Sequence, residues 1–129
     1  MRRLALLTVV IALAGCGDDK PGKEDAESVV RDFAKAVSDS DGKRFCNELV
    51  TREYLEQTTG ATGDNAVSQC VKQIDALQRS LKIVKIDKTV IDGDRATVTT
   101  QVETQGQRGP QVFRLESQDG EFRLTSNRP

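Results

Sequence analysis

The sequence predicts an α+β fold in which N-terminal helices pack on a four-stranded antiparallel sheet. Two patterns in the chain indicate this fold. As far as Leu81, apolar residues recur every three or four positions, which is the spacing of one face of a helix. Beyond Leu81 they recur at every second position, which is typical of strands with one buried face. Helices followed by a run of strands are typical of folds in which helices cover one face of an antiparallel sheet.

The helical half contains amphipathic segments separated by turn-forming residues. A short second helix follows the first, with Asp41 as its N-cap, and Thr51 caps a further turn. We expect a loop over 57–65, after which Asp64 or Asn65 caps the third helix. The apolar residues of the three main segments are Val29, Val30, Phe33, Ala34 and Val37, then Phe45, Cys46 and Leu49, and finally Val67, Cys70, Val71, Ile74, Leu77 and Leu81.

The second half of the chain predicts a meander of four antiparallel strands. Aspartate and glycine at 92–94 are typical of a hairpin turn, and threonines in the following segment favour a strand. We expect, in chain order, strands over 83–91, 95–104, 112–115 and 121–125, joined by turns at 92–94, 105–110 and 119–120.

The first residues have the pattern of an exported protein. A basic start at 1–3 precedes an uncharged run at 4–14, and small residues lead to Cys16. This run of eleven residues rises about 16 Å as a helix, roughly half of a bilayer core, so it is too short to span one. The sequence LAGC at 13–16 resembles the lipobox of bacterial lipoproteins.

The lipobox resemblance implies that residues 1–15 are a signal peptide, removed by cleavage after Gly15. Cys16 would then carry a diacylglyceryl thioether and an acyl group such as palmitate on its amine. Two or more chains anchor stably, which implies a lipid-anchored protein of the cell membrane that faces the extracytoplasmic side. Residues 16–25 are polar and predict a tether, and 26–129 predict a single α+β domain.

The charge of the chain predicts no attraction to an anionic surface. Lysine and arginine number 19 against 20 aspartates and glutamates, which argues against a nucleic-acid partner. Removal of residues 1–15 takes two arginines from a chain of net charge −1 and leaves −3. We therefore expect the lipid on Cys16, and not the protein surface, to hold the domain at the membrane.

Two cysteines remain besides the lipidated one. Cys46 and Cys70 lie on the apolar faces of their helices, and an exported chain enters a compartment where disulfides persist. We expect them to form a disulfide; two buried free thiols are the alternative. The chain has no histidine and no CxxC sequence, so we expect neither a metal site nor a redox pair.

The order of elements resembles the nuclear transport factor 2-like superfamily, which includes SnoaL-like and cystatin-like domains. The resemblance covers about residues 26–127 and rests on element order, element lengths and the cysteine pair; a strand usual between the second and third helices is not evident. It implies a strongly curved sheet that forms a cone with the helices. An apolar pocket in this cone would be lined by aromatic residues, namely Phe33, Phe45, Tyr54, Phe113 and Phe122.

Enzymes of the resembling superfamily work inside the cone with an aspartate or histidine and a tyrosine or second acid. Without histidine, a base must be a carboxylate, and Asp32 or Asp75 with Tyr54 could transfer a proton in principle. Both aspartates occupy polar helix positions, which usually face solvent. We therefore expect no catalytic residues and no cofactor. An open pocket of roughly 300 Å³ or more with Tyr54 or an aspartate pointing in would favour an enzyme or a small-molecule receptor. A closed pocket filled by the four phenylalanines would favour an interaction or structural role.

The sequence thus predicts a lipid-anchored, non-catalytic domain of the cell envelope. Its expected partners are the membrane, through Cys16, and either a small apolar ligand or another envelope protein. A small enzyme of the isomerase or dehydratase type, with an apolar cone pocket, is the alternative.

Overall fold

A computed structural model describes residues 21–125. The predicted signal peptide, Cys16 and the beginning of the predicted tether lie outside the described residues, as do residues 126–129. None of the described helices is long and apolar enough to cross a bilayer.

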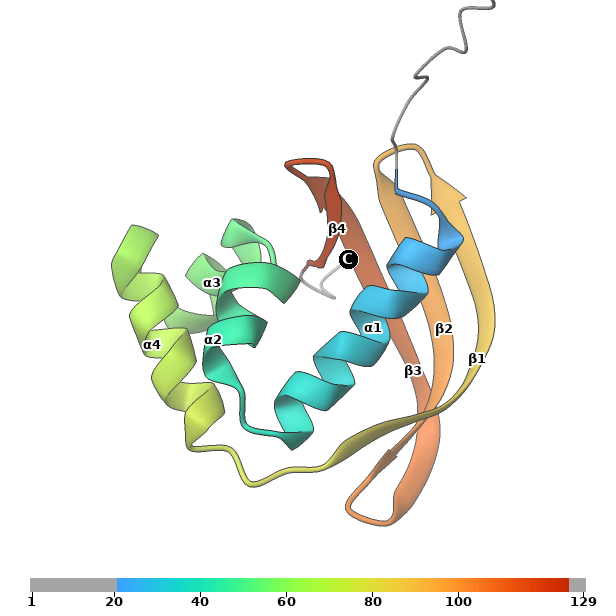
Figure 1. The fold of residues 1–129 in the computed structure, drawn as a ribbon, viewed down its shortest axis with the longest axis horizontal. Coiled ribbons are helices and arrows are strands. Elements are labelled where there is room, and N and C mark those ends of the chain that lie inside the picture. Colours follow the sequence, from blue (N-terminus) through green and yellow to red (C-terminus); the bar gives the residue numbers. More distant parts are fainter. Residues whose placement is uncertain (1–20, 126–129) are drawn as a thin grey trace, which may run out of the picture.

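Helices come first along the chain and strands follow, so the predicted α+β fold is confirmed (Figure 1). The helical elements are α1 (Lys23–Ser38), α2 (Gly42–Arg44), the π-helical turn η1 (Phe45–Leu49), α3 (Arg52–Thr59) and α4 (Gly63–Asp75). The strands are β1 (Leu81–Asp92), β2 (Arg95–Thr104), β3 (Gln107–Gln118) and β4 (Glu121–Leu124). They form one sheet in the order β1-β2-β3-β4, and each neighbouring pair is antiparallel.

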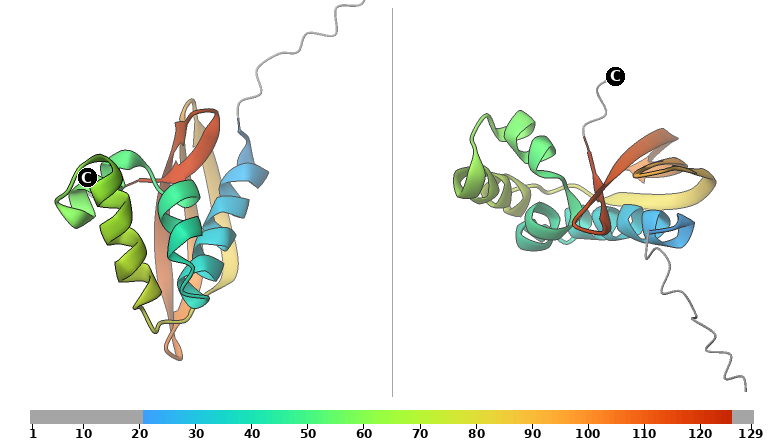
Figure 2. Two further views of the ribbon diagram at one scale, coloured as in Figure 1. Left: turned by 60° about the vertical axis from the view of Figure 1, so that its left-hand side comes forward. Right: turned by 90° about the horizontal axis from the view of Figure 1, so that it is seen from above.

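Helix α1 packs across the curved sheet, and the other helices stand beside it (Figure 2). Its buried residues Ala26, Val30, Ala34 and Val37 recur every three or four positions, which turns one stripe of the helix to the strands. The helix begins at Lys23 because the Gly22 N–H donates to Asp25 Oδ2 (2.7 Å). Residues 23–25, assigned above to the tether, therefore belong to α1.

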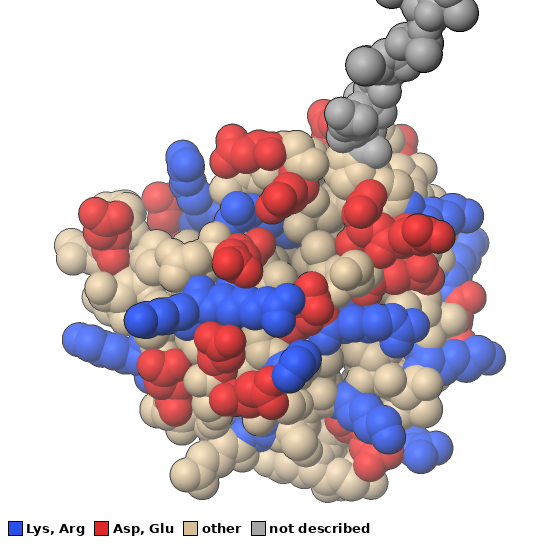
Figure 3. Space-filling view, viewed as in Figure 1, with Lys and Arg blue, Asp and Glu red and all other residues tan. Residues whose placement is uncertain are grey.

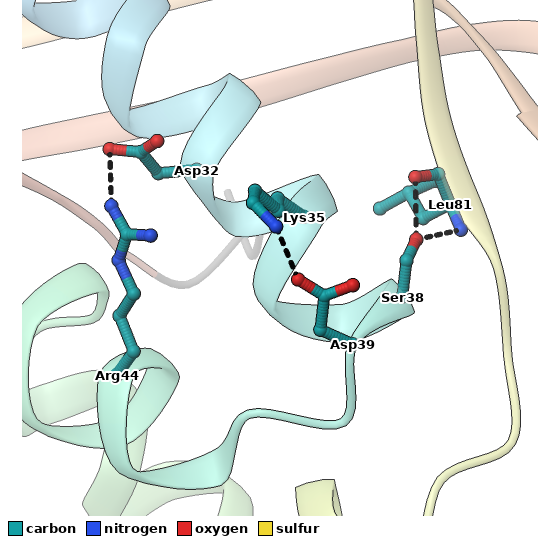
Figure 4. Close-up of polar contacts among 6 residues, drawn as sticks. All are labelled: Asp32, Lys35, Ser38, Asp39, Arg44 and Leu81. Atoms are coloured by element: carbon teal, nitrogen blue, oxygen red, sulfur yellow. Dashed lines mark hydrogen bonds and ion pairs between the residues drawn. The ribbon is translucent and has the colours of Figure 1, made fainter.

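The end of α1 is tied to the start of the sheet. Ser38 Oγ accepts a hydrogen bond from the Leu81 N–H and donates one to the Leu81 carbonyl, each at 2.9 Å (Figure 4). At the other end of the helix, Thr89 Oγ1 donates to Glu27 Oε1 at 3.2 Å. Helix α1 therefore lies along β1, with its first turns near the β1–β2 hairpin.

The two short helices begin where the sequence predicts. Asp41 Oδ1 accepts from the Arg44 N–H at 3.2 Å, and Thr51 Oγ1 accepts from the Tyr54 N–H at 3.1 Å. Each side chain satisfies a backbone donor that has no partner inside its own helix. A parallel bridge between Val50 and Leu124 joins this region to the sheet. This bridge is the counterpart of the strand that the sequence did not reveal.

The predicted loop over 57–65 is wrong in length. Helix α3 continues to Thr59. The Thr59 hydroxyl donates to the Leu55 carbonyl (2.6 Å), four residues earlier in the same helix, and so does not compete with the helical conformation. Gly60 ends the helix with a left-handed φ of 71°. Helix α4 then begins at Gly63 with Thr62 at its N-cap, so Asp64 and Asn65 are not the caps.

The predicted third helix also ends earlier than expected. Helix α4 stops at Asp75, so Leu77 and Leu81 are not on its face. Hydrogen bonds to distant residues hold the chain outside the helix after Asp75. Ser40 Oγ donates to the Leu77 carbonyl (2.6 Å), and the Leu81 N–H donates to Ser38 Oγ. The apolar spacing of the sequence continues through this segment, but the helix does not.

The expected turn over 105–110 is shorter in the structure. Gln105 and Gly106 form it with φ values of 51° and 80°, which are typical of a two-residue hairpin. Pro110 lies inside β3, opposite Gln101. Because β4 is short and runs beside the far end of β3, the strand has a neighbour on one side only at Pro110, where a proline is tolerated.

The core lies between α1 and the inner face of the sheet. Alternate residues of β2, β3 and β4 are buried there, and Phe122 is the largest fully buried side chain in the described chain. A disulfide joins Cys46 of η1 to Cys70 of α4, as the sequence predicts. The buried residues of these three strands are Ala96, Val98, Thr100, Val102, Phe113, Leu115, Phe122 and Leu124.

Candidate functional site

The candidate site is a cavity of about 250 Å³ between α1, α3 and the inner face of the sheet. It lies toward the end of the sheet that carries the β2–β3 turn. None of its lining side chains is charged, although charged residues make up 30% of the chain. The lining residues are Phe33, Tyr54, Leu81, Val102, Thr104, Gln111, Phe113, Leu124 and Thr125.

Aromatic packing fixes one wall of the cavity. The ring of Phe33 meets that of Phe113 in an edge-on contact with centroids 5.6 Å apart. Behind them, Phe45 is buried and packs against Phe33 at 5.1 Å and against Tyr54 at 6.2 Å. Phe45 therefore holds two lining rings in place without lining the cavity itself.

Tyr54 supplies a polar group at this wall. The Thr51 cap fixes its backbone, and the side chain is half-buried. Desolvation by burial raises the pKa of Tyr54 above its ordinary value, so the hydroxyl stays protonated at neutral pH and can donate a hydrogen bond. Within residues 21–125 that hydroxyl has no hydrogen-bond partner, whereas the Tyr54 backbone bonds to the side chains of Thr51 and Thr58.

The structure brings together three of the five aromatic residues predicted to line the pocket: Phe33, Tyr54 and Phe113. Phe45 lies behind the wall, and Phe122 lines a different hollow near the start of α1. Phe122 is displaced because the short β4 runs along the opposite end of β3.

Sequence reasoning missed the aliphatic and polar lining residues. Val102 and Phe113 share the inner face by strand alternation, a signal that could have found Val102, Thr104 and Gln111 had the β2–β3 turn been predicted as two residues. Leu81 was missed because its spacing fits the preceding helix.

The two candidate carboxylates lie elsewhere. Asp32 Oδ2 is 3.1 Å from Arg44 Nη2 (Figure 4). Both residues border the hollow that Phe122 lines. Asp75 Oδ1 accepts a hydrogen bond from the Gly42 N–H at 2.9 Å. Neither carboxylate lines the cavity with Tyr54. In the part of the chain that the structure describes, no group of three or more potential ligands is placed to hold a metal ion.

Comparison by sequence finds no relatives: no protein-family model and no curated protein matches the chain. Comparison by structure finds similar folds. A proposed NTF2-like transpeptidase from Campylobacter jejuni superposes with a TM-score of 0.51 at 16% identity, covering 80% of this chain and 99% of that one.

A second solved structure is similar to the same extent. It is a proposed scytalone dehydratase from Novosphingobium aromaticivorans, with a TM-score of 0.51 at 15% identity, covering 78% of this chain and 77% of that one. At these identities the likeness concerns the fold and not the activity. The helices and curved antiparallel sheet of this chain therefore form an NTF2-like fold.

Proposed function

We propose that the protein is a lipid-anchored domain of the cell envelope that binds a small, uncharged, mostly apolar ligand in the cone cavity. The observation that carries this proposal is the uncharged lining of a cavity of about 250 Å³, which includes Tyr54 with its protonated hydroxyl. Apolar walls with a few placed polar groups are typical of small-molecule sites. Thr104, Gln111 and Thr125 add further hydrogen-bonding groups.

The proposed role is binding and not catalysis. No carboxylate lines the cavity, so Tyr54 has no partner there to accept a proton from a substrate. The positions of Asp32 on Arg44 and of Asp75 on Gly42 give both carboxylates structural contacts. The isomerase or dehydratase alternative is therefore not favoured.

The proposed location rests on the N-terminal sequence and on the cysteines. The LAGC sequence at 13–16 supplies the anchor, and the Cys46–Cys70 disulfide fits an oxidising compartment outside the cytoplasm.

The binding proposal is tested by calorimetry with 2-naphthol, a neutral bicyclic phenol. We expect 2-naphthol to bind and naphthalene-2-sulfonate, which adds a charge to the same rings, not to bind. Tyr54→Phe should lower the affinity for 2-naphthol about fivefold, equal to roughly 1 kcal/mol for one lost hydrogen bond. The same variant should leave the affinity for naphthalene unchanged, because naphthalene makes no hydrogen bond.

A matched pair of variants locates the ligand. Val102→Trp places a large ring inside the cavity, whereas Val112→Trp makes the same change at an exposed position. Binding should be lost in the first and kept in the second, with both proteins retaining the native circular dichroism. Equal binding by the two variants would place the ligand elsewhere and contradict the proposal.

The anchor is tested by mass spectrometry of the mature N-terminus after expression in a bacterial host. The expected product begins at Cys16 and carries the mass of a diacylglyceryl group and an acyl chain. Cys16→Ser should stay unprocessed, and Gly17→Ser, the neighbouring control, should be processed normally. A mature chain that begins at another residue without lipid would remove this part of the proposal.

A further inference from the structure

The sheet has a second face, which points away from α1. Helix α1 lies on one side of β1 and β2 only (Figure 2). Because side chains alternate along a strand, the residues between the buried positions of β2 point to the other side. The register then defines the outer sheet face as Lys82, Lys85, Lys88 and Val90 of β1, Thr97, Thr99, Gln101 and Glu103 of β2, and Arg108, Pro110, Val112 and Arg114 of β3.

The outer sheet face is basic. It carries five lysines and arginines, three of them in a row along β1. Two acids oppose them: Glu103 lies 3.0 Å from Arg108, and Asp87, in a bulge of β1, lies 3.6 Å from Lys85. Among these residues an excess of three positive charges remains, while Glu53 of α3, Asp92 and Glu116 border the end of the face that holds Val90, Thr97 and Arg114. The basic area ends at the β1–β2 turn, where Arg95 lies between Asp92 and Glu116.

Apolar side chains are exposed among these charges. The large hydrophobic residues of the described chain that stand in solvent are Val84, Val90 and Val112, which are 39%, 44% and 41% exposed. Val90 and Val112 belong to the outer sheet face, and Val84 sits at a bulge of β1. Basic residues interspersed with exposed apolar ones are typical of surfaces that lie on a membrane.

The helical layer has the opposite charge. Residues 21–80 hold 8 lysines and arginines against 11 aspartates and glutamates. Figure 3 shows acidic side chains gathered over the upper part of the α1 side of the molecule. Residues 81–125 hold seven lysines and arginines against seven aspartates and glutamates, so the sheet half is neutral as a whole and its positive charge is local to the outer sheet face. The expectation that the protein surface has no attraction to a membrane averages over this local charge.

We propose that the outer sheet face docks the domain on the anionic phospholipid headgroups of the membrane that anchors it. This inference rests on the proposed lipid anchor. Cys16 and Gly22 are six residues apart and span at most about 20 Å, against about 10 Å between packed layers of structure. The chain enters α1 beside β1, since Glu27 bonds to Thr89, so the lysines of β1 lie within reach of the bilayer.

The energetic argument favours docking. Each lysine near an anionic surface contributes about 1 kcal/mol, and a basic surface adds to what the acyl chains supply. In this orientation α1, on the opposite side of the sheet, faces the aqueous phase.

The initial rate of lysine acetylation in the lipidated full chain tests the orientation without a change of sequence. The chain is reconstituted in vesicles of phosphatidylcholine, or of phosphatidylcholine with about 30% phosphatidylglycerol. We expect Lys82, Lys85 and Lys88 to react at least about threefold more slowly in the anionic vesicles. The effect should vanish at about 1 M salt, where the screening length is about 3 Å. Lys43 and Lys72, exposed on the helical layer, are internal controls and should react equally in both vesicles.

A variant pair separates this face from a general effect of charge. Val112→Glu puts a carboxylate in the outer sheet face and should remove the protection, whereas Gln69→Glu on α4 makes a charge change of the same size and should preserve it. Equal rates in both vesicles, or the same slowing at Lys43 and Lys72, would overturn the proposal. A chain that fails to float with neutral vesicles would instead contradict the lipid anchor.

Discussion

Replacing both Cys46 and Cys70 by alanine is expected to lower the free energy of unfolding by about 3–4 kcal/mol. The bridge closes a loop with a sequence separation of 24 residues, for which the chain-entropy model gives roughly 3.5 kcal/mol. Helix α4 packs on α3, α2 and η1 and buries few residues, so the bridge is its strongest link to the rest of the chain. The loss is large against a total stability of about 5–15 kcal/mol.

Urea denaturation followed by circular dichroism measures this loss. Wild-type protein in the presence of a reducing agent should lose about the same stability as the double variant. Ser68→Ala, at an exposed position of the same helix, is the control and should change stability by less than about 0.5 kcal/mol. A loss below about 1 kcal/mol in the double variant would show that packing alone holds α4 in place.

Gly42→Ala is expected to cost about 2–3 kcal/mol, although glycine to alanine usually favours a helix. A Cβ at Gly42 would lie 2.6 Å from Asp75 Oδ1 and 2.6 Å from the Val71 carbonyl oxygen. The backbone of α4 cannot give way locally, so α2 must move and the hydrogen bond from the Gly42 N–H to Asp75 is lost.

Gly109→Ala is the matched control for Gly42→Ala. A Cβ at Gly109 meets nothing within 4 Å, and its φ is not in the left-handed region, so stability should change by less than about 1 kcal/mol. Thermal denaturation of the two variants compares them directly. If Gly42→Ala were as stable as Gly109→Ala, the close packing of α2 on α4 would be contradicted.

Local chemistry explains which parts of the fold the sequence predicts well. Asp41 and Thr51 cap their helices because the capping bond is made within three residues, independent of the rest of the chain. The strands of the meander are predicted by alternation, which needs only their own residues. The Cys46–Cys70 pairing follows because both cysteines lie on apolar faces that share one core.

Tertiary contacts decide what the sequence could not predict. The end of α4 depends on Ser40 and Ser38, which bond to Leu77 and Leu81 more than thirty residues away in the chain. Asp75 was expected to face solvent; it is exposed, but it also accepts the Gly42 N–H, a contact that no local pattern encodes.

The lining of the cavity was likewise predictable only where it depends on local sequence. Its aromatic residues were predicted in part because a small chain has few of them, with four phenylalanines and one tyrosine in all. Its aliphatic and polar lining comes from the ends of strands whose boundaries depend on pairing. Register, and not composition, decides that Thr104 and Gln111 flank the same space.

The two register shifts in β1 also affect how copies of the protein meet one another. In the described chain β1 is an edge of the sheet, and a straight edge strand of twelve residues would offer free N–H and carbonyl groups to any extended chain nearby. Bulges between Ile83 and Lys85 and between Ile86 and Lys88 interrupt the regular spacing of these N–H and carbonyl groups along the edge. An incoming strand cannot pair along the whole edge, which protects copies of the protein from stacking into fibrils.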